Sequence, residues 1–161
     1  RSNDWSTAKA LYPIACQQID IVCNKWLNKN DILDMPDSVW QFIDWSKSLN
    51  RQAAEQATAI YSAKSLLGLA TKLGIKKDKE KWRNLINKLT ASALVNLYDK
   101  ENGLFISGNQ KQKSWASQIW MILAGVVDKN TQLPLNLALP TSCIIWYKLT
   151  CFVIWMWKHI T

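Results

Sequence analysis

The chain has 161 residues, a net charge of +8 and a hydrophobic fraction of 48%, which suffices for one domain with its own core. Gly (5) and Pro (4) are scarce, so the composition disfavours both a turn-rich all-β fold and disorder. The most basic run, residues 76–81, alternates with acidic residues as a solvated helix start does, so we expect no nucleic-acid partner.

Apolar residues at helical spacing predict two helices in the first half of the chain. The first covers about residues 6–28, and Pro13 inside it either kinks the helix or marks its true start. The second covers about residues 50–73. Asn50 is the expected N-cap, and Gly74 is the expected stop, because glycine adopts the left-handed conformation that ends many helices.

Two further helices are predicted in the second half. One starts near Asp78 and continues to about Leu97, and the other runs from about Ser114 to Val127. Between them, Asn102-Gly103 predicts a turn, and residues 104–106 are consistent with a short strand.

The connections between these helices alternate in length, because those at 29–49 and 98–113 are long and the Gly74 turn is short. Antiparallel helices send alternate connections to opposite ends, so both long segments are expected at one end. That layout is typical of an array of helical hairpins with function on the decorated face. The alternative is that the long loops are merely long.

The first long segment concentrates large aromatic and acidic side chains between residues 34 and 45. They are Asp34, Asp37, Trp40, Phe42, Asp44 and Trp45. A tryptophan beside an aspartate suits a sugar, because the indole packs on the C–H face of the ring while the carboxylate accepts hydroxyl hydrogen bonds. The alternative is a loop that packs its own aromatic side chains down and uses Asp44 as a helix cap.

The second long segment mixes tryptophan with side chains that both donate and accept hydrogen bonds. They are Phe105, Ser107, Gln110, Gln112, Ser114, Trp115, Gln118 and Trp120. This mixture suits a neutral polyol ligand. Two alternatives are that Ser114 is only an N-cap and that Trp120, on one stripe with Leu123, belongs to the core.

Other catalytic chemistry has little support in the sequence. The four cysteines and the single histidine do not fall at metal-ligand spacings, so we expect no metal and no cofactor. Cys16 and Cys23 share one helix face and are expected to pack as small hydrophobic residues. His159 lies near the C-terminal end, which disfavours a Ser-His-Asp set and leaves paired carboxylates as the remaining acid–base chemistry.

Two elements of the chain resemble the catalytic domain of the α-L-rhamnosidases, glycoside hydrolase family 78. The first is Phe42-Ile43-Asp44-Trp45, followed by Leu49 and by Gln52-Ala53 at a helix start. The second is Gly103-Leu104-Phe105 leading into residues 114–120, and the likeness extends over residues 12–128. The resemblance implies an all-α fold, a partial (α/α)6 barrel of about two helical hairpins with long loops on one face.

The resemblance also implies a function and a set of site residues. The family hydrolyses terminal α-L-rhamnosyl bonds with inversion, so a rhamnose-containing glycan or glycoside is the expected partner. Carried over, it places Asp44 and Trp45 against the sugar, with Trp40, Trp115 and Gln112 as further substrate-binding candidates. Neither the family's Arg-Asp-Glu-Arg-like acidic run nor its general base has an equivalent here, so we expect an inactive fragment with no catalytic carboxylate.

The chain divides into a partial barrel, residues 1–131, and an irregular apolar tail, residues 132–161. Shifted by two bases with permissive codon choices, the sequence from Pro140 can be read as a string that resembles the helix with which the family continues, so a frameshift near residue 131 is our hypothesis. A hydrophobic anchor is the alternative, but Lys148 interrupts a stretch that is short for a span, and we expect no membrane contact. The N-terminus shows no signal segment.

Two rival functions are weighed against the rhamnosidase-like one. A non-enzymatic helical interaction scaffold of solenoid type would repeat itself every ~34–45 residues, and the sequence shows no convincing self-similarity. A different six-hairpin hydrolase, for example one acting on uronides, is the nearest rival among enzymes.

Overall fold

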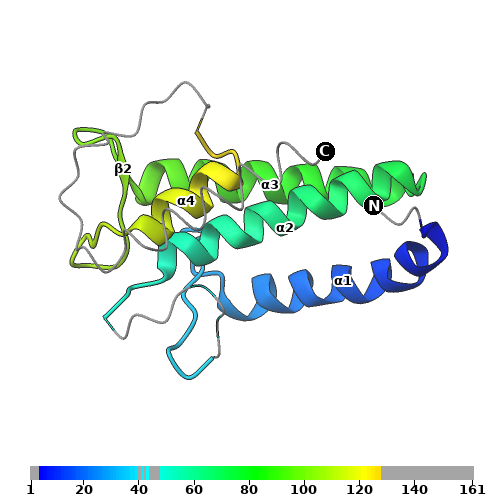
Figure 1. Ribbon diagram of the computed structural model, residues 1–161, viewed down its shortest axis with the longest axis horizontal. Coiled ribbons are helices and arrows are strands. Elements are labelled where there is room, and N and C mark those ends of the chain that lie inside the picture. The colour runs from blue at the N-terminus through cyan, green and yellow to red at the C-terminus, as the bar shows by residue number, and fades with distance from the viewer. Residues whose placement is uncertain (1–3, 40, 42, 44–47, 128–161) are drawn as a thin grey trace.

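The computed structural model describes residues 4–39, 41, 43 and 48–127. The apolar tail and its proposed frameshift therefore lie outside the described residues. Within them the elements follow in the order α1 (Trp5–Trp26), α2 (Gln52–Lys72), α3 (Lys76–Asn96), β1 (Tyr98–Asp99), β2 (Leu104–Phe105) and α4 (Trp115–Leu123) (Figure 1). The all-α prediction is confirmed.

α1 begins well before Pro13 and continues through it. Asp4 caps the helix, since its carboxylate accepts the backbone N–H of Thr7 at 3.0 Å. Of the two roles considered for Pro13, that of marking the helix start is therefore wrong.

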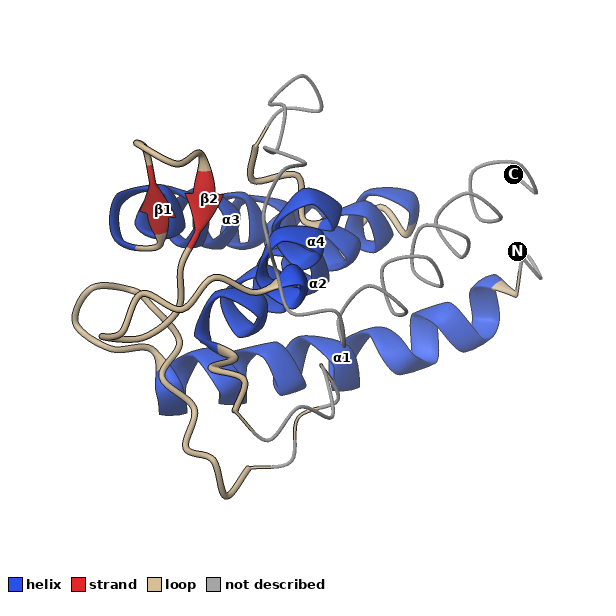
Figure 2. Ribbon diagram, turned by 60° about the vertical axis from the view of Figure 1, so that its left-hand side comes forward, coloured by secondary structure: helices blue, strands red, loops and turns tan. Residues whose placement is uncertain are grey.

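α2 is the central helix and lies between α1 on one side and α3 and α4 on the other (Figures 1 and 2). Its buried faces are rich in alanine, with Ala53, Ala57, Ala63 and Ala70 fully buried. Small side chains let neighbouring helices approach closely, and larger residues from those neighbours fill the interior. α2 is thus the rigid axis on which the loops are mounted.

The core has two parts along this axis. The larger cluster includes Ile60, Leu89 and Phe105 and lies toward the end that carries the long loops. The smaller cluster surrounds Trp82, which is fully buried and whose Nε1–H donates to the Tyr12 hydroxyl at 3.0 Å. This second cluster ties α1 to α3 at the opposite end.

The turn between α2 and α3 ends α2 as predicted. Gly74 has φ +73°, the Ile75 N–H donates to the Ala70 carbonyl at 2.9 Å, and the Gly74 N–H donates to the Thr71 carbonyl at 3.3 Å. This pair of bonds satisfies two carbonyls that the helix end leaves without partners.

Two glycine-to-alanine substitutions on this hairpin are expected to have opposite signs. G74A puts a Cβ at a positive φ and should lower the free energy of unfolding by about 1 kcal/mol. G68A lies inside α2, where an added Cβ meets nothing within 4 Å, and should raise it by about 0.5–1 kcal/mol. Urea unfolding of both variants checks the pair, and effects of equal sign would contradict it.

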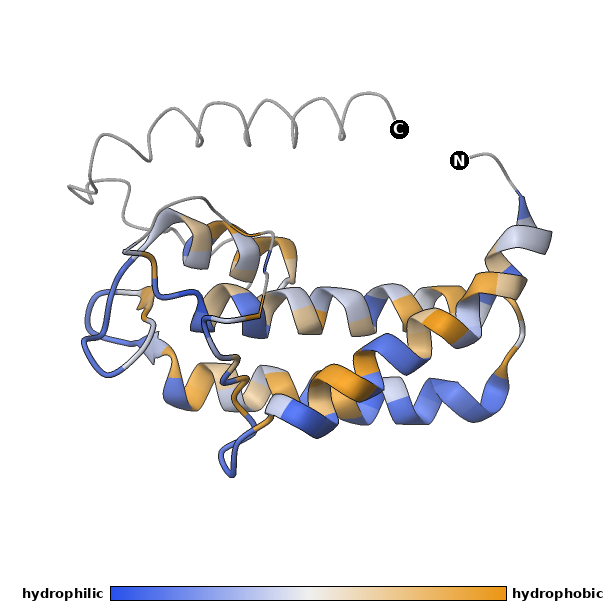
Figure 3. Cartoon of the chain, turned by 90° about the horizontal axis from the view of Figure 1, so that it is seen from below, coloured by the Kyte–Doolittle hydropathy of each residue, from blue (hydrophilic) through white to orange (hydrophobic). Residues whose placement is uncertain are grey.

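The two long connections lie at the same end of the helices, as their alternation in length predicts (Figure 1). We call this the loop end, made of the described residues within 27–51 and 97–114. The Asn50 N–H donates to Gln112 Oε1 at 2.7 Å, and the Gly108 N–H donates to Gln52 Oε1 at 3.0 Å. The two connections are thus bonded to each other, and Figure 3 shows the loop end as mostly hydrophilic.

Within the second connection, β1 and β2 form a short hairpin, which contains the predicted turn and the strand expected near residues 104–106 but pairs that strand with one that was not predicted. Tyr98 pairs with Phe105 and Asp99 with Leu104, and Gly103 in the turn has φ +66°. None of the described helices combines the length and the apolar character needed to cross a membrane.

Candidate functional site

A buried glutamine of α4 fastens the β hairpin at the loop end. Gln118 accepts the Phe105 N–H and donates to the Phe105 carbonyl, both at 2.8 Å. In an antiparallel pair, alternate residues direct their backbone groups away from the partner strand. Phe105 is such a residue, since the neighbouring Ile106 N–H donates to the Leu97 carbonyl. The Gln118 amide therefore bonds the backbone groups of Phe105 that a third strand would bond in a larger sheet.

A second buried glutamine, Gln56 of α2, fastens the other connection. Its Oε1 accepts the Leu33 N–H at 2.9 Å, and its Nε2 donates to the carbonyls of Asp31 and Leu89, both at 3.0 Å. One side chain thus joins the first long connection, α2 and α3.

Two serine side chains and Gln112 complete the network at the loop end. Ser107 Oγ accepts the Ala53 N–H at 3.1 Å, and Ser114 caps α4 by accepting the Ser117 N–H at 3.1 Å. Gln112 donates to the Ser48 carbonyl at 2.8 Å, besides accepting the Asn50 N–H. Gln112 thus holds the backbone that precedes α2, Ser107 holds the first turn of α2, and Ser114 holds the first turn of α4.

This network changes the interpretation of the second connection. Ser107, Ser114 and Gln118, whose polar character suggested a polyol ligand, are buried and bonded within the chain. The alternative that Ser114 is an N-cap is confirmed. Trp120 is partly buried against the larger core cluster, as the core alternative for it predicts.

The predicted sugar-binding residues divide into two groups. Trp115 is the first residue of α4 and is half-buried, and Gln112 lies in the network just described. Asp44, Trp45 and Trp40 lie outside the described residues. Their arrangement around a sugar stays a prediction.

The structure adds one chemically notable residue that the sequence analysis missed. Glu55, in the first turn of α2, is only 5% exposed. Burial raises the pKa of its carboxyl to about 7, against the lowering effects of the Gln41 side chain, the Arg51 charge and the Met35 backbone N–H. The sequence did carry a signal for Glu55, because this acidic residue stands among the alanines that form the buried stripe of α2.

The groups around Glu55 belong to the first connection and to the start of α2. Arg51 lies one turn earlier and donates to Asp37 Oδ1 at 2.9 Å. The nearby Asp34 carboxylate adds to the raised pKa of Glu55. A buried acid that titrates near neutrality, at the base of a loop, is a recognised mark of functional sites.

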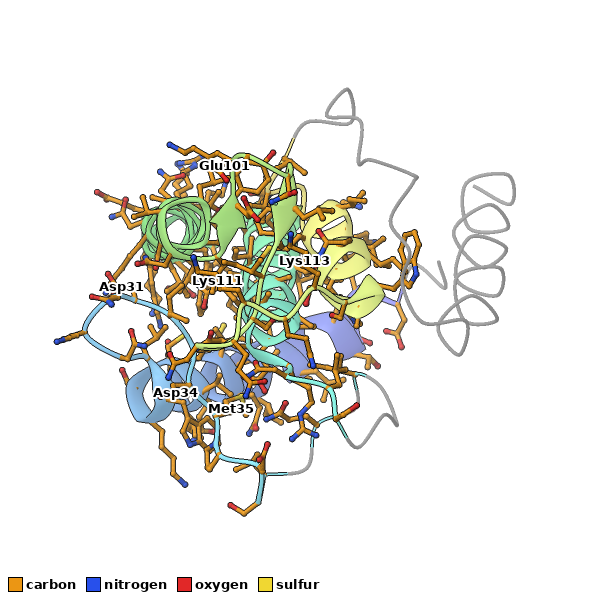
Figure 4. All side chains as sticks on the ribbon, turned by 90° about the vertical axis from the view of Figure 1, so that its left-hand side faces the viewer. Asp31, Asp34, Met35, Glu101, Lys111 and Lys113 are labelled. Carbon is orange, nitrogen blue, oxygen red and sulfur yellow. The ribbon has the colours of Figure 1, made fainter. Side chains whose placement is uncertain are left out.

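The surface of the loop end carries charges of both signs. Figure 4 views this end directly: Asp34 and Met35 lie on the side of α1, Glu101 lies by the β hairpin, and Lys111 and Lys113 lie between them (Figure 4). Among the described residues, no three His, Cys, Asp or Glu side chains are placed to hold a metal ion. These labelled charges favour neither an anionic nor a cationic ligand.

The fold thus defines the chain as an all-α protein of antiparallel helical hairpins whose two long connections meet at one end. It is similar to part of a solved rhamnosidase from Klebsiella oxytoca with rhamnose bound, at 35% sequence identity and a TM-score of 0.72. The similarity covers 78% of this chain and 24% of that one, so the chain spans about a quarter of the rhamnosidase. No family model and no curated protein matches the chain.

Proposed function

We propose that this chain is part of the helical catalytic domain of a family 78 glycoside hydrolase, an inverting enzyme with six helical hairpins that removes terminal α-L-rhamnosyl groups. The observation that supports the proposal is the 35% identity over 78% of this chain to a rhamnosidase with rhamnose bound. The proposal is also supported by the hydrogen bonds that join both long connections at one end, where they would form one wall of the sugar pocket.

In this proposal the residues have distinct roles. Trp45 stacks on the C–H face of rhamnose and Asp44 accepts its hydroxyls, with Trp40 and Trp115 as further walls. Gln112 acts indirectly. Its Oε1 accepts the Asn50 N–H and its Nε2 donates to the Ser48 carbonyl, so its amide holds the backbone of residues 48–50 in place.

The proposal assigns the chain sugar binding without hydrolysis, with the general acid and base in other parts of the enzyme. Glu55 does not fill either role, because its carboxyl is buried beneath the first connection. We therefore expect the 161-residue chain to release no nitrophenol from 4-nitrophenyl α-L-rhamnopyranoside. If the chain did hydrolyse this substrate, and a substitution within the chain abolished that hydrolysis, the assignment would be contradicted.

Replacing Trp45 with alanine is expected to weaken binding of L-rhamnose at least about tenfold, because the loss of one stacking contact costs about 1.4 kcal/mol or more. Titration calorimetry or ligand-observed NMR measures the affinity. W5A is the matched control, since Trp5 is an exposed tryptophan on α1, at the N-terminal end of that helix. Equal losses in W45A and W5A, or no rhamnose binding by the unmodified chain, would overturn the proposed site.

A further inference from the structure

We propose that the turn at residues 107–112 is a positioning element that sets the spacing between two predicted walls of the sugar pocket, Trp45 and Trp115. The turn is closed on itself, since the backbones of Ser107 and Gln112 form an antiparallel bridge in which each N–H donates to the other carbonyl at 2.9 Å. The consequence for sugar binding rests on the proposed function, whereas the attachment of the turn to the start of α2 does not.

Gln112 supplies the two bonds nearest in the chain to the predicted sugar-binding residues. Its Oε1 accepts the Asn50 N–H at 2.7 Å, and its Nε2 donates to the Ser48 carbonyl at 2.8 Å. A side-chain amide both accepts and donates, so one residue can hold a backbone segment at two points. Two points fix the direction of that segment as well as its place.

The other side of the turn is bonded to the first residues of α2. The Gly108 N–H donates to Gln52 Oε1 at 3.0 Å, and Ser107 Oγ accepts the Ala53 N–H at 3.1 Å. Ser107 is only 1% exposed, so water does not replace its bond easily. Because α2 is the central helix of the fold, these bonds attach the turn to the rigid framework.

Close packing accompanies the hydrogen bonds. Gly108 has φ +64°, and a Cβ on it would lie 2.3 Å from Asn50 Nδ2, well inside van der Waals contact. The Asn50 side chain is itself held, because its Oδ1 accepts the Gln52 N–H at 3.1 Å. The turn therefore fits against residues 50–52 with no room for a side chain at Gly108.

The bond between Ser48 and Gln112 joins the two chain segments that carry the tryptophans. Trp45 precedes Ser48 by three residues, and Trp115 follows Gln112 by three residues. Three residues of extended chain span at most about 11 Å, so the bond limits how far each tryptophan can lie from it. The attachment at Leu33 is twelve residues before Trp45 and leaves a much longer tether.

The turn thus links one wall that a helix fixes to one that it does not. Trp115 is placed by the first turn of α4, which Ser114 caps. Trp45 belongs to the first connection and is tied to α4 through Ser48 and the turn. A rigid ring binds with less loss of conformational entropy where its walls are already at the right spacing. The apparent affinity falls with the fraction of molecules in which they are.

Gln112→Leu and Ser107→Ala test the proposal through the affinity for L-rhamnose, measured by titration calorimetry. Q112L removes both bonds to residues 48–50. S107A removes a bond to α2 from a side chain too buried to contact a sugar. Each net hydrogen bond favours the attached state about two- to tenfold, so Q112L should weaken rhamnose binding at least about fivefold and S107A at least about twofold.

Two control variants accompany these. Q110L makes the same chemical change at an exposed residue of the same turn and should bind rhamnose like the unmodified chain. G74A strains the turn at the opposite end of α2 and so lowers stability without touching residues 107–112. It should leave the affinity unchanged.

Hydrogen exchange reports the attachment without any ligand. In Q112L the Asn50 amide loses its acceptor and should exchange faster. The Gly108 amide should also exchange faster, although its own acceptor is unchanged, because the turn is held as one unit. The Phe105 amide, bonded to Gln118, is the internal reference and should not change.

Three results would overturn the proposal. Weaker rhamnose binding in Q112L with unchanged binding in S107A would show that Gln112 contacts the sugar directly. A loss of affinity in G74A equal to that in Q112L would show only an effect of stability. Unchanged exchange at Gly108 in Q112L would show that the bonds act singly.

Failure of the proposed function gives a different pattern. If the unmodified chain binds no rhamnose, the proposed function and the role of the turn in sugar binding both fail. The exchange of Asn50 and Gly108 then still decides whether the turn holds residues 48–53. If the unmodified chain, Q112L and S107A all bind rhamnose equally well, the proposed function stands and this inference is refuted.

Discussion

Replacing Gln118 with leucine is expected to lower the free energy of unfolding by about 3–5 kcal/mol. The leucine keeps a similar volume but neither donates nor accepts a hydrogen bond. The N–H and the carbonyl of Phe105, both bonded to Gln118 in a part of the chain from which water is excluded, would then have no partner. Each such buried group costs about 1–3 kcal/mol.

Urea unfolding followed by circular dichroism measures this effect, and Gln110→Leu is the matched control. Gln110 belongs to the same connection but is exposed, so the same chemical change there should alter stability by less than about 0.5 kcal/mol. A Q118L variant within about 1 kcal/mol of the unmodified chain would show that water or a shifted strand satisfies Phe105 instead.

The second large effect concerns Glu55. The difference between the pKa of Glu55 in the folded and in the unfolded chain decides in which direction stability changes with pH. The pKa of Glu55 is about 7 in the folded chain and near 4.5 when exposed, so the folded state binds this proton more tightly than the unfolded state. The resulting stabilisation is fully present below about pH 4.5 and is lost as the pH rises through 7. At pH 8 the folded chain therefore contains a buried carboxylate whose burial costs about 3 kcal/mol.

E55Q removes that ionisation and should raise the free energy of unfolding at pH 8 by up to about 3 kcal/mol, with little change at pH 4.5. Urea unfolding at the two pH values measures the difference, and E80Q, which removes an exposed acid of α3, serves as the control. The interpretation fails if E55Q and the unmodified chain show the same dependence of stability on pH.

Local signals predicted the helices and their ends well, because caps and turns depend on residues close in sequence. Gly74 ends α2 and Ser114 caps α4 as expected. Asn50 does bond the start of α2, accepting the Gln52 N–H at 3.1 Å, although the cap position itself belongs to Arg51. The fourth helix ends at Leu123 rather than near Val127, and Gly125, just after it, has a positive φ.

The interior of the loop end was not predictable in the same way. Gln118 and Phe105 are 13 residues apart, and no periodic pattern says that one will bond the backbone of the other. Polar residues near tryptophan therefore suggested a ligand, although several of them bind the chain itself. Glu55 was missed for a related reason: its burial comes from a connection about twenty residues earlier in the chain.

The main-chain attachments of the first connection have a practical consequence for protein engineering. Gln56 holds the backbone at Leu33 and Gln112 holds it at Ser48 and Asn50, so both borders of the stretch between them are fixed by side chains outside it. The stretch between these attachment points can therefore be exchanged as one unit. Its length and composition can be varied in a library of grafted loops while the attachment points, and the start of α2 behind them, keep their places.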